Sequence, residues 1–287
     1  MQTEKVLPVL CCKSTFDTEH KNEVLFTGER GAMSRTTHTQ AIVFSLKPLG
    51  ENNSSVRLIT ATDGLIFATL YGGPKSRLRP FVSPWNSGTL YLYVNGRTGT
   101  RKITDFDVKS YHLSFRSSLY KTYAASLAAE LVLQTNCAGN APGCFPLVSG
   151  FLDGLDSVSV EQARTGLLRF LWRYLALLGV RPDAACCASC GKPFPSGASG
   201  GIRVSLADGF LCAACASSFH AHDSTMRAVP ETVIRYLAAI SHCAPAAARA
   251  VPIDADTERH VRALLFFLTE QAVGKPLKTL TLSGGIL

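Results

Sequence analysis

The sequence predicts an α+β protein in which a small N-terminal β-barrel precedes an α-helical domain that carries a four-cysteine metal knuckle. Three observations predict this class. Five short strand-like runs follow one another without helical crossovers, a helical period replaces them after about residue 116, and two CxxC pairs interrupt the helical part. The 287 residues are enough for two domains and an insert.

The first 32 residues show neither a helical nor an alternating apolar period. They carry four basic and five acidic groups among small polar residues. We expect residues 1–32 to be a disordered leader, or the product of a mis-set start codon with Met33 as the true start.

Residues 33–115 are predicted to form the barrel. The runs are rich in β-branched and aromatic residues and alternate in places, as where Leu90 and Leu92 interleave with Tyr91 and Tyr93. The predicted strands span 40–46, 55–60, 65–71, 89–94 and 102–108. Among small five-stranded barrels the OB-fold is the leading candidate, and its strand face and loops bind nucleic acid.

Residues 116–287 are predicted to form the helical domain. Ser117-Ser118 can cap a first helix, residues 160–179 carry a clear apolar stripe that ends at Gly179, and further helices are expected at 231–241 and 257–273. The apolar positions of the first helix are Leu119, Tyr123, Leu127 and Leu131. The stripe of the second consists of Leu167, Leu168, Leu171, Trp172, Leu175 and Leu178, with Arg169 and Arg173 off it. The tail from 275 onward shows no clear period.

Two CxxC pairs, Cys187/Cys190 and Cys212/Cys215, lie 21 residues apart in an insert at about 184–218. Each CxxC turn can aim two thiolates at one point, and two such turns supply the four soft ligands of a tetrahedral zinc site. The sequence therefore predicts one structural zinc ion per chain. Because cysteine fills all four positions, no open coordination site is left for catalysis.

The residues around the cysteines support this interpretation and leave some alternatives. Between the pairs, 202–206 and 210–211 are predicted to form a hairpin that returns to the metal, and Gly191 can adopt the positive φ that a knuckle needs. The alternatives are two redox or unpaired CxxC sequences, or a substitute ligand. The candidate substitutes are Cys186, His220 and His222.

Charge indicates a polyanionic partner. The net charge is +8, and residues 33–115 carry ten basic groups against four acidic ones. A positive field on one small domain points to nucleic acid. In an extended loop, Lys75, Arg77 and Arg79 would point to the same side. The candidate DNA-binding residues are Lys75, Arg77, Arg79, Arg57, Arg97, Arg101 and Lys102. Any single one of them can also be an ordinary solvated cation.

The sequence gives little support for an enzyme. It contains no GxxxxGK[ST] or HExxH, and His112 lacks a partner at informative spacing. Asp105 and Asp107 alternate with an aromatic residue and should decorate the outer face of a strand. Tyr91 and Tyr93 can stack on bases, although barrel packing is their commoner fate. The scattered remaining cysteines and the lack of a membrane-length apolar run favour a cytoplasmic, nucleoid-associated protein.

Several strings, in the same order along the chain, resemble the bacterial RecO family of recombination mediators over about 33–282. They are Ala41–Glu51, Asp63–Gly73 with the basic loop 75–77, Phe81–Pro84, Leu175–Gly179, the CxxC pairs and Gly274–Leu280. Where the family often has Arg-Gly-Ala-Arg-Lys before the basic loop, this chain has Tyr71-Gly-Gly-Pro-Lys75, so two cations are missing there.

The resemblance implies a non-enzymatic protein that anneals complementary single strands. It also implies that RecA is loaded, with RecR, onto DNA coated by single-stranded DNA-binding protein. The implied partners are single-stranded DNA, RecR and single-stranded DNA-binding protein, with duplex DNA left open and no membrane. The alternative is a zinc-ribbon protein that binds RNA or the transcription or translation machinery, since it would share the basic barrel and the metal.

Overall fold

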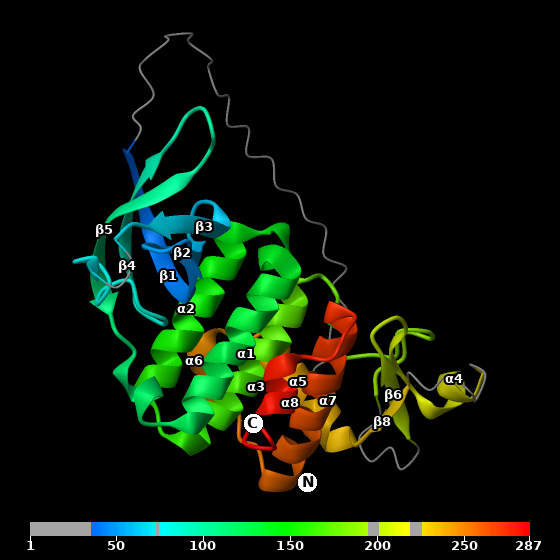
Figure 1. The fold of residues 1–287 in the computed structure, drawn as a ribbon. Helices are drawn as coiled ribbons and strands as arrows, with labels where there is room; N and C mark the ends of the chain where they lie inside the picture. Colours follow the sequence, from blue (N-terminus) through cyan, green and yellow to red (C-terminus); the bar gives the residue numbers. More distant parts are fainter. Residues whose placement is uncertain (1–35, 73–74, 195–200, 219–225) are drawn as a thin grey trace. The chain divides into compact units, whose positions relative to one another are not determined.

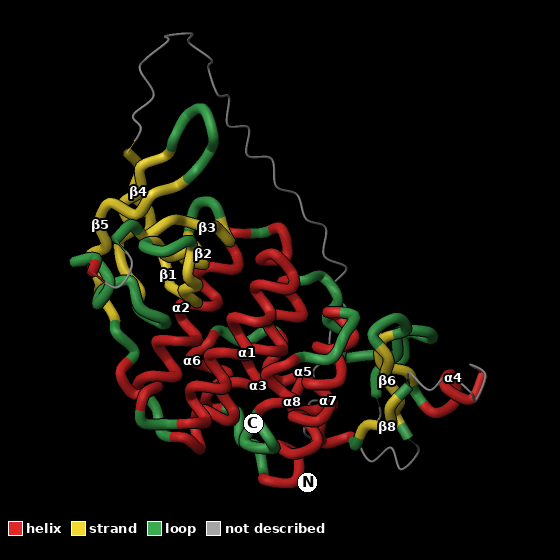
Figure 2. The backbone as a smooth tube through the Cα atoms, in the orientation of Figure 1, coloured by secondary structure: helices red, strands yellow, loops and turns green. Residues whose placement is uncertain are grey.

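The computed structural model describes residues 36–72, 75–194, 201–218 and 226–287, all within one compact unit. Figure 1 shows its strands and helices in chain order, and Figure 2 separates them by type. The expected leader at 1–32 lies outside the described residues.

Five strands close into a barrel in the order β1-β2-β3-β5-β4, and β1 pairs with both β2 and β4. The strands are β1 (Thr36–Leu49), β2 (Asn53–Thr60), β3 (Gly64–Leu70), β4 (Ser87–Val94) and β5 (Arg101–Ser110). Their pairing is antiparallel except between β3 and β5, where Thr69 lies opposite Lys102 in a parallel register. The predicted OB-like barrel is confirmed.

Alternation along the strands builds the barrel core. Leu90 and Leu92 are buried, whereas Tyr91 between them is exposed. On β3, Ile66 and Ala68 face the core, and the interleaved Phe67 faces solvent. A strand places successive side chains on opposite faces, so each strand gives one row to the core and one to the outer surface.

The helices pack beside the barrel around a second apolar core. They are α1 (Leu119–Thr135), α2 (Ala141–Ser157), α3 (Val160–Leu177), α5 (Glu231–Ser241), α6 (Pro245–Ala250), α7 (Ala255–Val273) and α8 (Lys278–Leu282). Two 3₁₀ turns flank α1: η2 (Leu113–Arg116) and η3 (Asn136–Gly139). In the centre of this core Trp172 is fully buried, and its indole nitrogen donates to Ser241 Oγ at 3.0 Å.

Ser118 caps α1 as expected, because its hydroxyl accepts from the Lys121 backbone nitrogen. The predicted apolar stripe of α1 holds only in part. Leu127 and Leu131 are fully buried, but Leu119 is 59% exposed. Leu119 is the first residue of the helix and lies beyond the packed core, so the four-residue period overstates the buried face.

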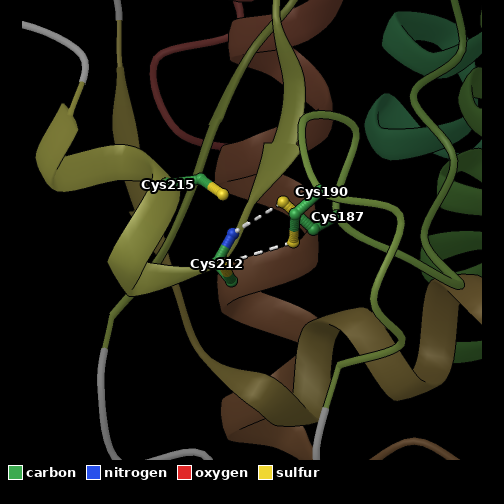
Figure 3. Close-up of side chains that lie close together, drawn as sticks. All are labelled: Cys187, Cys190, Cys212 and Cys215. Carbon is green, nitrogen blue, oxygen red and sulfur yellow. Dashed lines mark hydrogen bonds between the residues drawn. The ribbon is translucent and has the colours of Figure 1, made fainter.

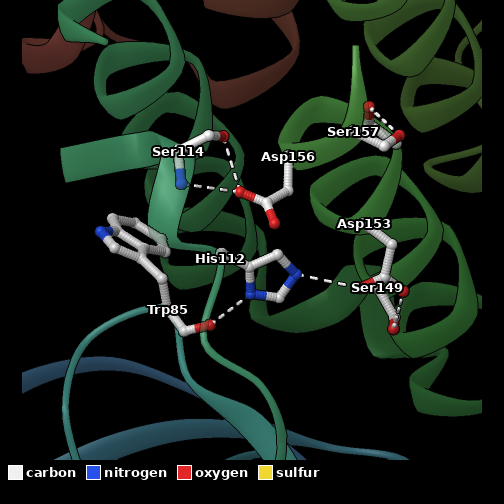
Figure 4. A network of polar contacts seen from close by, with 8 residues as sticks. Trp85, His112, Ser114, Ser149, Asp153, Asp156 and Ser157 are labelled. Atoms are coloured by element: carbon white, nitrogen blue, oxygen red, sulfur yellow. Dashed lines mark hydrogen bonds and ion pairs between the residues drawn. The ribbon is translucent and has the colours of Figure 1, made fainter. Parts of the chain in front are cut away.

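A polar network ties the end of β5 to α2 (Figure 4). His112 is buried, its Nδ1 lies 2.6 Å from the Trp85 carbonyl oxygen, and its Nε2 lies 2.9 Å from the Asp153 carboxylate. One turn further along α2, Asp156 Oδ1 accepts from both the backbone nitrogen and the hydroxyl of Ser114. His112 thus holds the barrel against the helices, which accounts for a histidine that has no catalytic partner in the sequence.

The C-terminal segment, for which the sequence shows no period, is fixed by two glutamates. Glu130 on α1 accepts from the backbone nitrogens of Lys278 and Thr279 at the start of α8. Glu270 on α7 accepts from the Leu277 backbone nitrogen at 3.0 Å. Side chains on distant helices therefore cap this short helix, which local periodicity does not reveal.

A three-stranded sheet in the order β7-β6-β8 forms in and just beyond the predicted insert, because its third strand lies after residue 218, and a short helix follows β7. Its elements are β6 (Ile202–Ser205), β7 (Gly209–Leu211), α4 (Ala213–Ser218) and β8 (Arg227–Val229). The predicted hairpin is confirmed by the antiparallel β6–β7 pair. Within the described ranges, no helix is long and apolar enough to span a lipid bilayer.

Candidate metal centre and nucleic-acid interface

Two backbone turns bring the CxxC cysteines together. In the first, Gly191 has φ +69° and its backbone nitrogen donates to the Cys187 carbonyl at 2.9 Å. In the second, Cys212 directly follows β7 and Cys215 lies in the first turn of α4. The two turns meet because the backbone nitrogen of Ala188 donates to the Phe210 carbonyl on β7. The hairpin therefore serves to deliver the second pair to the first.

The four thiol groups of Cys187, Cys190, Cys212 and Cys215 point toward one another (Figure 3), with all four sulfurs within 4.8 Å of each other. The Cys190 and Cys212 sulfurs are 3.9 Å apart. Zinc–sulfur bonds of about 2.3 Å in a tetrahedron require sulfurs roughly 3.8 Å apart. The cluster is thus close enough to hold one metal ion, and four thiolates suit a soft cation.

The pKa values of two thiols in the cluster also favour binding of a cation. Burial acts to raise the pKa of the Cys187 thiol, but backbone N–H groups around its sulfur, including those of Cys190 and Cys212, lower this pKa to about 6. The Ser189 side chain acts to lower the pKa of Cys215, but the neighbouring thiols raise it to about 12. The Cys187 thiolate forms readily while the Cys215 thiol resists ionisation, and a bound cation removes that conflict.

The substitute ligands do not join the cluster in the described part of the chain. Cys186 is adjacent in sequence, yet its thiol points to the Asp183 carboxylate at 3.5 Å. His220 and His222 lie outside the described residues.

The basic loop between β3 and β4 is exposed but not extended. Lys75, Arg77 and Arg79 are all exposed, and Leu78 between them packs against the barrel core. Successive turns shape the backbone, as where the Arg79 nitrogen donates to the Ser76 carbonyl at 3.0 Å. The expectation of an extended loop is therefore wrong, because Leu78 anchors the loop and forces it to turn. The role of the three cations stays a prediction.

The other candidate cations lie on the strands and on the β4–β5 turn. Arg57 on β2 stands over the Phe67 ring, with its guanidinium carbon 5.6 Å from the ring centroid. Lys102 on β5 stands over the Tyr71 ring at 4.9 Å. Arg97 is exposed in the turn, and Arg101 is half-buried at the start of β5. Such cation–π contacts at exposed sites contribute about 0.5–1 kcal/mol.

None of the seven cations forms an ion pair with a described residue, since the ion pairs found there involve only His112, Arg259 and His260. Asp105 and Asp107 are exposed on β5, as expected for the outer face of a strand. The barrel thus presents positive charge that carboxylates on the described surface do not neutralise.

Sequence reasoning missed two exposed aromatic residues, Phe67 on β3 and Tyr71 directly after it. Phe67 is 54% exposed and Tyr71 is 52% exposed. Tyr91, which was considered for stacking, contacts the His38 ring at 5.9 Å, and Tyr93 is half-buried. The alternation of 65–71 carried the signal, because it places both missed aromatics opposite the core-facing row.

A second feature was not visible in the sequence. A cavity of about 500 Å³ opens between α2, α3 and α6, and we call it the arginine groove. Apolar side chains such as Pro146 and Phe151 line it together with Arg169, Arg173 and Arg249, and its lining contains no carboxylate. The pKa of Arg173 is lowered by burial and by the charges of the two neighbouring arginines.

Family models match nearly the whole described chain. The model described as Recombination protein O N terminal matches residues 33–111, and that described as Recombination protein O C terminal matches residues 116–281. The first match covers the barrel, and the second covers the helices with the cysteine cluster.

Curated relatives carry the name DNA repair protein RecO. One from Heliobacterium modesticaldum is 28% identical over 168 residues, which are 58% of this chain and 60% of the relative. Another from Desulfatibacillum aliphaticivorans is 27% identical over 44% of this chain and 49% of its own length. A third from Pelobacter propionicus is 27% identical over 65% of this chain and 74% of its own. The chain thus spans about half to three quarters of the length of these relatives.

Proposed function

The chain belongs to the RecO family of recombination proteins, and from that premise we propose that it is a DNA-binding recombination mediator in DNA repair. In this role it anneals complementary single strands. With RecR it assists the loading of RecA onto DNA coated by single-stranded DNA-binding protein. It acts by binding and positioning, without covalent chemistry.

The observation that carries this proposal is the set of exposed cations on a closed OB-like barrel. Lys75, Arg77, Arg79 and Arg97 extend from its loops, while Arg57, Arg101 and Lys102 occupy its strands. Carboxylates of the described surface leave these cations unpaired, so they are available to phosphates. Phosphate contacts are independent of sequence, which suits a protein that must anneal any pair of complementary strands.

The cysteine cluster holds one zinc ion with a structural role. Its four ligands are all thiolates of the chain, and such closed sites stabilise small sheets that cannot build a large core. The described core of the knuckle is small: Cys187, Leu211 and Ala216 are its buried members. The metal therefore stabilises the cysteine end of the insert, whereas Ile202, Val204 and Phe210 of its sheet are buried in the main core.

The arginine groove is the docking place for the acidic tail of single-stranded DNA-binding protein. Its three arginines repel one another in a partly buried setting, and a carboxylate-bearing peptide relieves that repulsion. Its apolar walls accept the side chains of such a tail. Gly150 and Gly166 line the groove, and a Cβ at either position would meet no atom within 4 Å.

Filling the groove tests this docking. Gly166→Leu adds a side chain where there is free space, so the fold should persist while the labelled acidic tail peptide binds at least tenfold more weakly. Thr232→Leu, at an exposed position on α5 outside the groove lining, serves as the control. Undiminished peptide affinity in Gly166→Leu would place the tail elsewhere.

The function as a whole is tested by strand annealing. Complementary oligonucleotides coated with the cognate single-stranded DNA-binding protein should anneal faster with the full chain, and RecR should promote RecA loading in the same reaction. The rival reading as an RNA-binding zinc-ribbon protein predicts a different outcome. In that case annealing would not exceed the spontaneous rate, and RNA would be bound more tightly than single-stranded DNA.

A further inference from the structure

A second groove runs along the seam between the outer face of the barrel and α1, with a volume of about 490 Å³. We call it the seam groove. Leu65, Phe67 and Arg57 form its barrel wall, and one face of α1 forms the other wall. Its size lies within the usual range for pockets that bind small organic groups.

The barrel wall offers a flat aromatic surface beside a cation. Phe67 is 54% exposed, so much of its ring is accessible to a ligand. Arg57 lies directly opposite Phe67 in the β2–β3 register, and its guanidinium carbon lies 5.6 Å from the ring centroid. An aromatic ring with a cation over it that pairs with no carboxylate of the described residues matches a nucleotide, whose base stacks and whose phosphate carries the charge.

The helix wall offers polar groups at regular spacing. Ser126, Glu130 and Gln134 follow one another every four residues, so they share one face of α1 toward the groove. Glu130 is committed to the first backbone nitrogens of α8. The amide of Gln134 has no hydrogen-bond partner among the described residues, and it can both donate to and accept from a base edge.

Charge fixes the direction in which a nucleotide enters. The Glu130 carboxylate repels phosphate from the helix wall, whereas Arg57 attracts it to the barrel wall. The base therefore lies between the Phe67 ring and α1, and the sugar–phosphate chain runs on the side of Arg57.

We propose that the seam groove holds one unstacked base of single-stranded DNA, stacked on Phe67, with Arg57 on its phosphate and Gln134 at its polar edge. This inference rests on the proposed function, because it assumes that the barrel binds single strands. Tyr71 is four residues beyond Phe67, in the turn directly after β3, and is 52% exposed. With Lys102 over its ring, Tyr71 provides a second stacking position outside the groove.

The test is binding of a fluorescent single-stranded oligonucleotide to four variants of the full chain. Phe67→Ala and Phe67→Leu remove the ring and should weaken affinity about 5- to 150-fold, the range for loss of one stacked base. Phe67→Tyr keeps the ring and should bind like the unaltered chain. Tyr111→Ala, which removes an exposed aromatic outside the groove, is the control and should change affinity less than twofold.

A second readout separates stacking from charge. Loss of a stacked base releases no counterion, so Phe67→Ala should leave the slope of log K against log salt unchanged. On the opposite wall, Gln134→Glu replaces the amide with a carboxylate of nearly equal size and should weaken binding several-fold. This result is informative even if the Phe67 variants fold poorly. If the affinities of Phe67→Ala and Gln134→Glu for the oligonucleotide both stay within twofold of that of the unaltered chain, the seam groove is not a base site. In that case the proposed function still stands if the unaltered chain binds single strands, and both fail if it does not.

Discussion

On the barrel, Lys75, Arg77 and Arg79 are exposed and meet no carboxylate of the described surface, whereas on α3 Arg169 and Arg173 are half-buried and donate to backbone carbonyls. The first group contributes little to the fold and is free for a partner. The second group joins α3 to the segment after α5 and to α6. Together with Arg249, it also lines the arginine groove. The same residue types thus stay exposed and unpaired on the described barrel surface, whereas on α3 they join neighbouring segments.

The largest expected effect is the loss of bound metal from the knuckle of the helical domain. Cys212→Ser should reduce bound zinc from one ion per chain to almost none, because apparent zinc-binding energies are on the order of 10–16 kcal/mol and depend on all four thiolates. The insert should then become sensitive to protease. Atomic absorption and limited proteolysis measure both.

The barrel provides the contrast in the same experiment. The salt dependence of single-strand binding by Cys212→Ser should match that of the unaltered chain, since none of the four clustered cysteines lies on the barrel. Unchanged metal content in this variant would contradict the ligand assignment. A flattened salt dependence would show that the knuckle itself contacts DNA.

A smaller effect concerns stability. Arg173→Ala should lower the free energy of unfolding by about 1.5–3 kcal/mol, because it leaves the Cys243 carbonyl without its charged donor. Arg77→Ala on the barrel is the matched control and should change it by no more than about 0.5 kcal/mol. Urea unfolding of both variants measures the difference. Equal effects would mean that the two groups of cations do not differ in structural role.

Much of the fold and of the cysteine site was predictable from the sequence, since the strands, α3 and the cysteine pairs carry strong local signals. The sequence did not reveal α2. Its Gly143, Pro146 and Gly150 are typical helix breakers. The helix forms because Asn140 caps it, accepting from the Gly143 nitrogen at 3.0 Å, and because Val148 and neighbouring apolar residues are buried against α3.

Both grooves were unpredictable for a related reason. The arginine groove needs α2, α3 and α6 to meet, and the seam groove needs α1 to lie along β2 and β3. Residues such as Phe67 and Gln134 are unremarkable in their own segments. Their proximity arises from tertiary packing, which neither spacing nor periodicity encodes. The turned backbone of the basic loop has the same origin, because it follows from the burial of Leu78 against the barrel.

The salt dependence of single-strand binding tests most directly whether the exposed barrel cations contact phosphate. If Lys75, Arg77 and Arg79 each meet one phosphate, binding releases about 0.7 counterion per contact. Their triple substitution by alanine should then flatten the slope of log K against log salt by about 2 and weaken every sequence alike. The control triple Arg235, Arg259 and Lys275 to alanine, exposed on the helical side, should leave the slope unchanged. Equal slopes for the two triples would contradict the account, because the loop would then not be the surface that meets DNA.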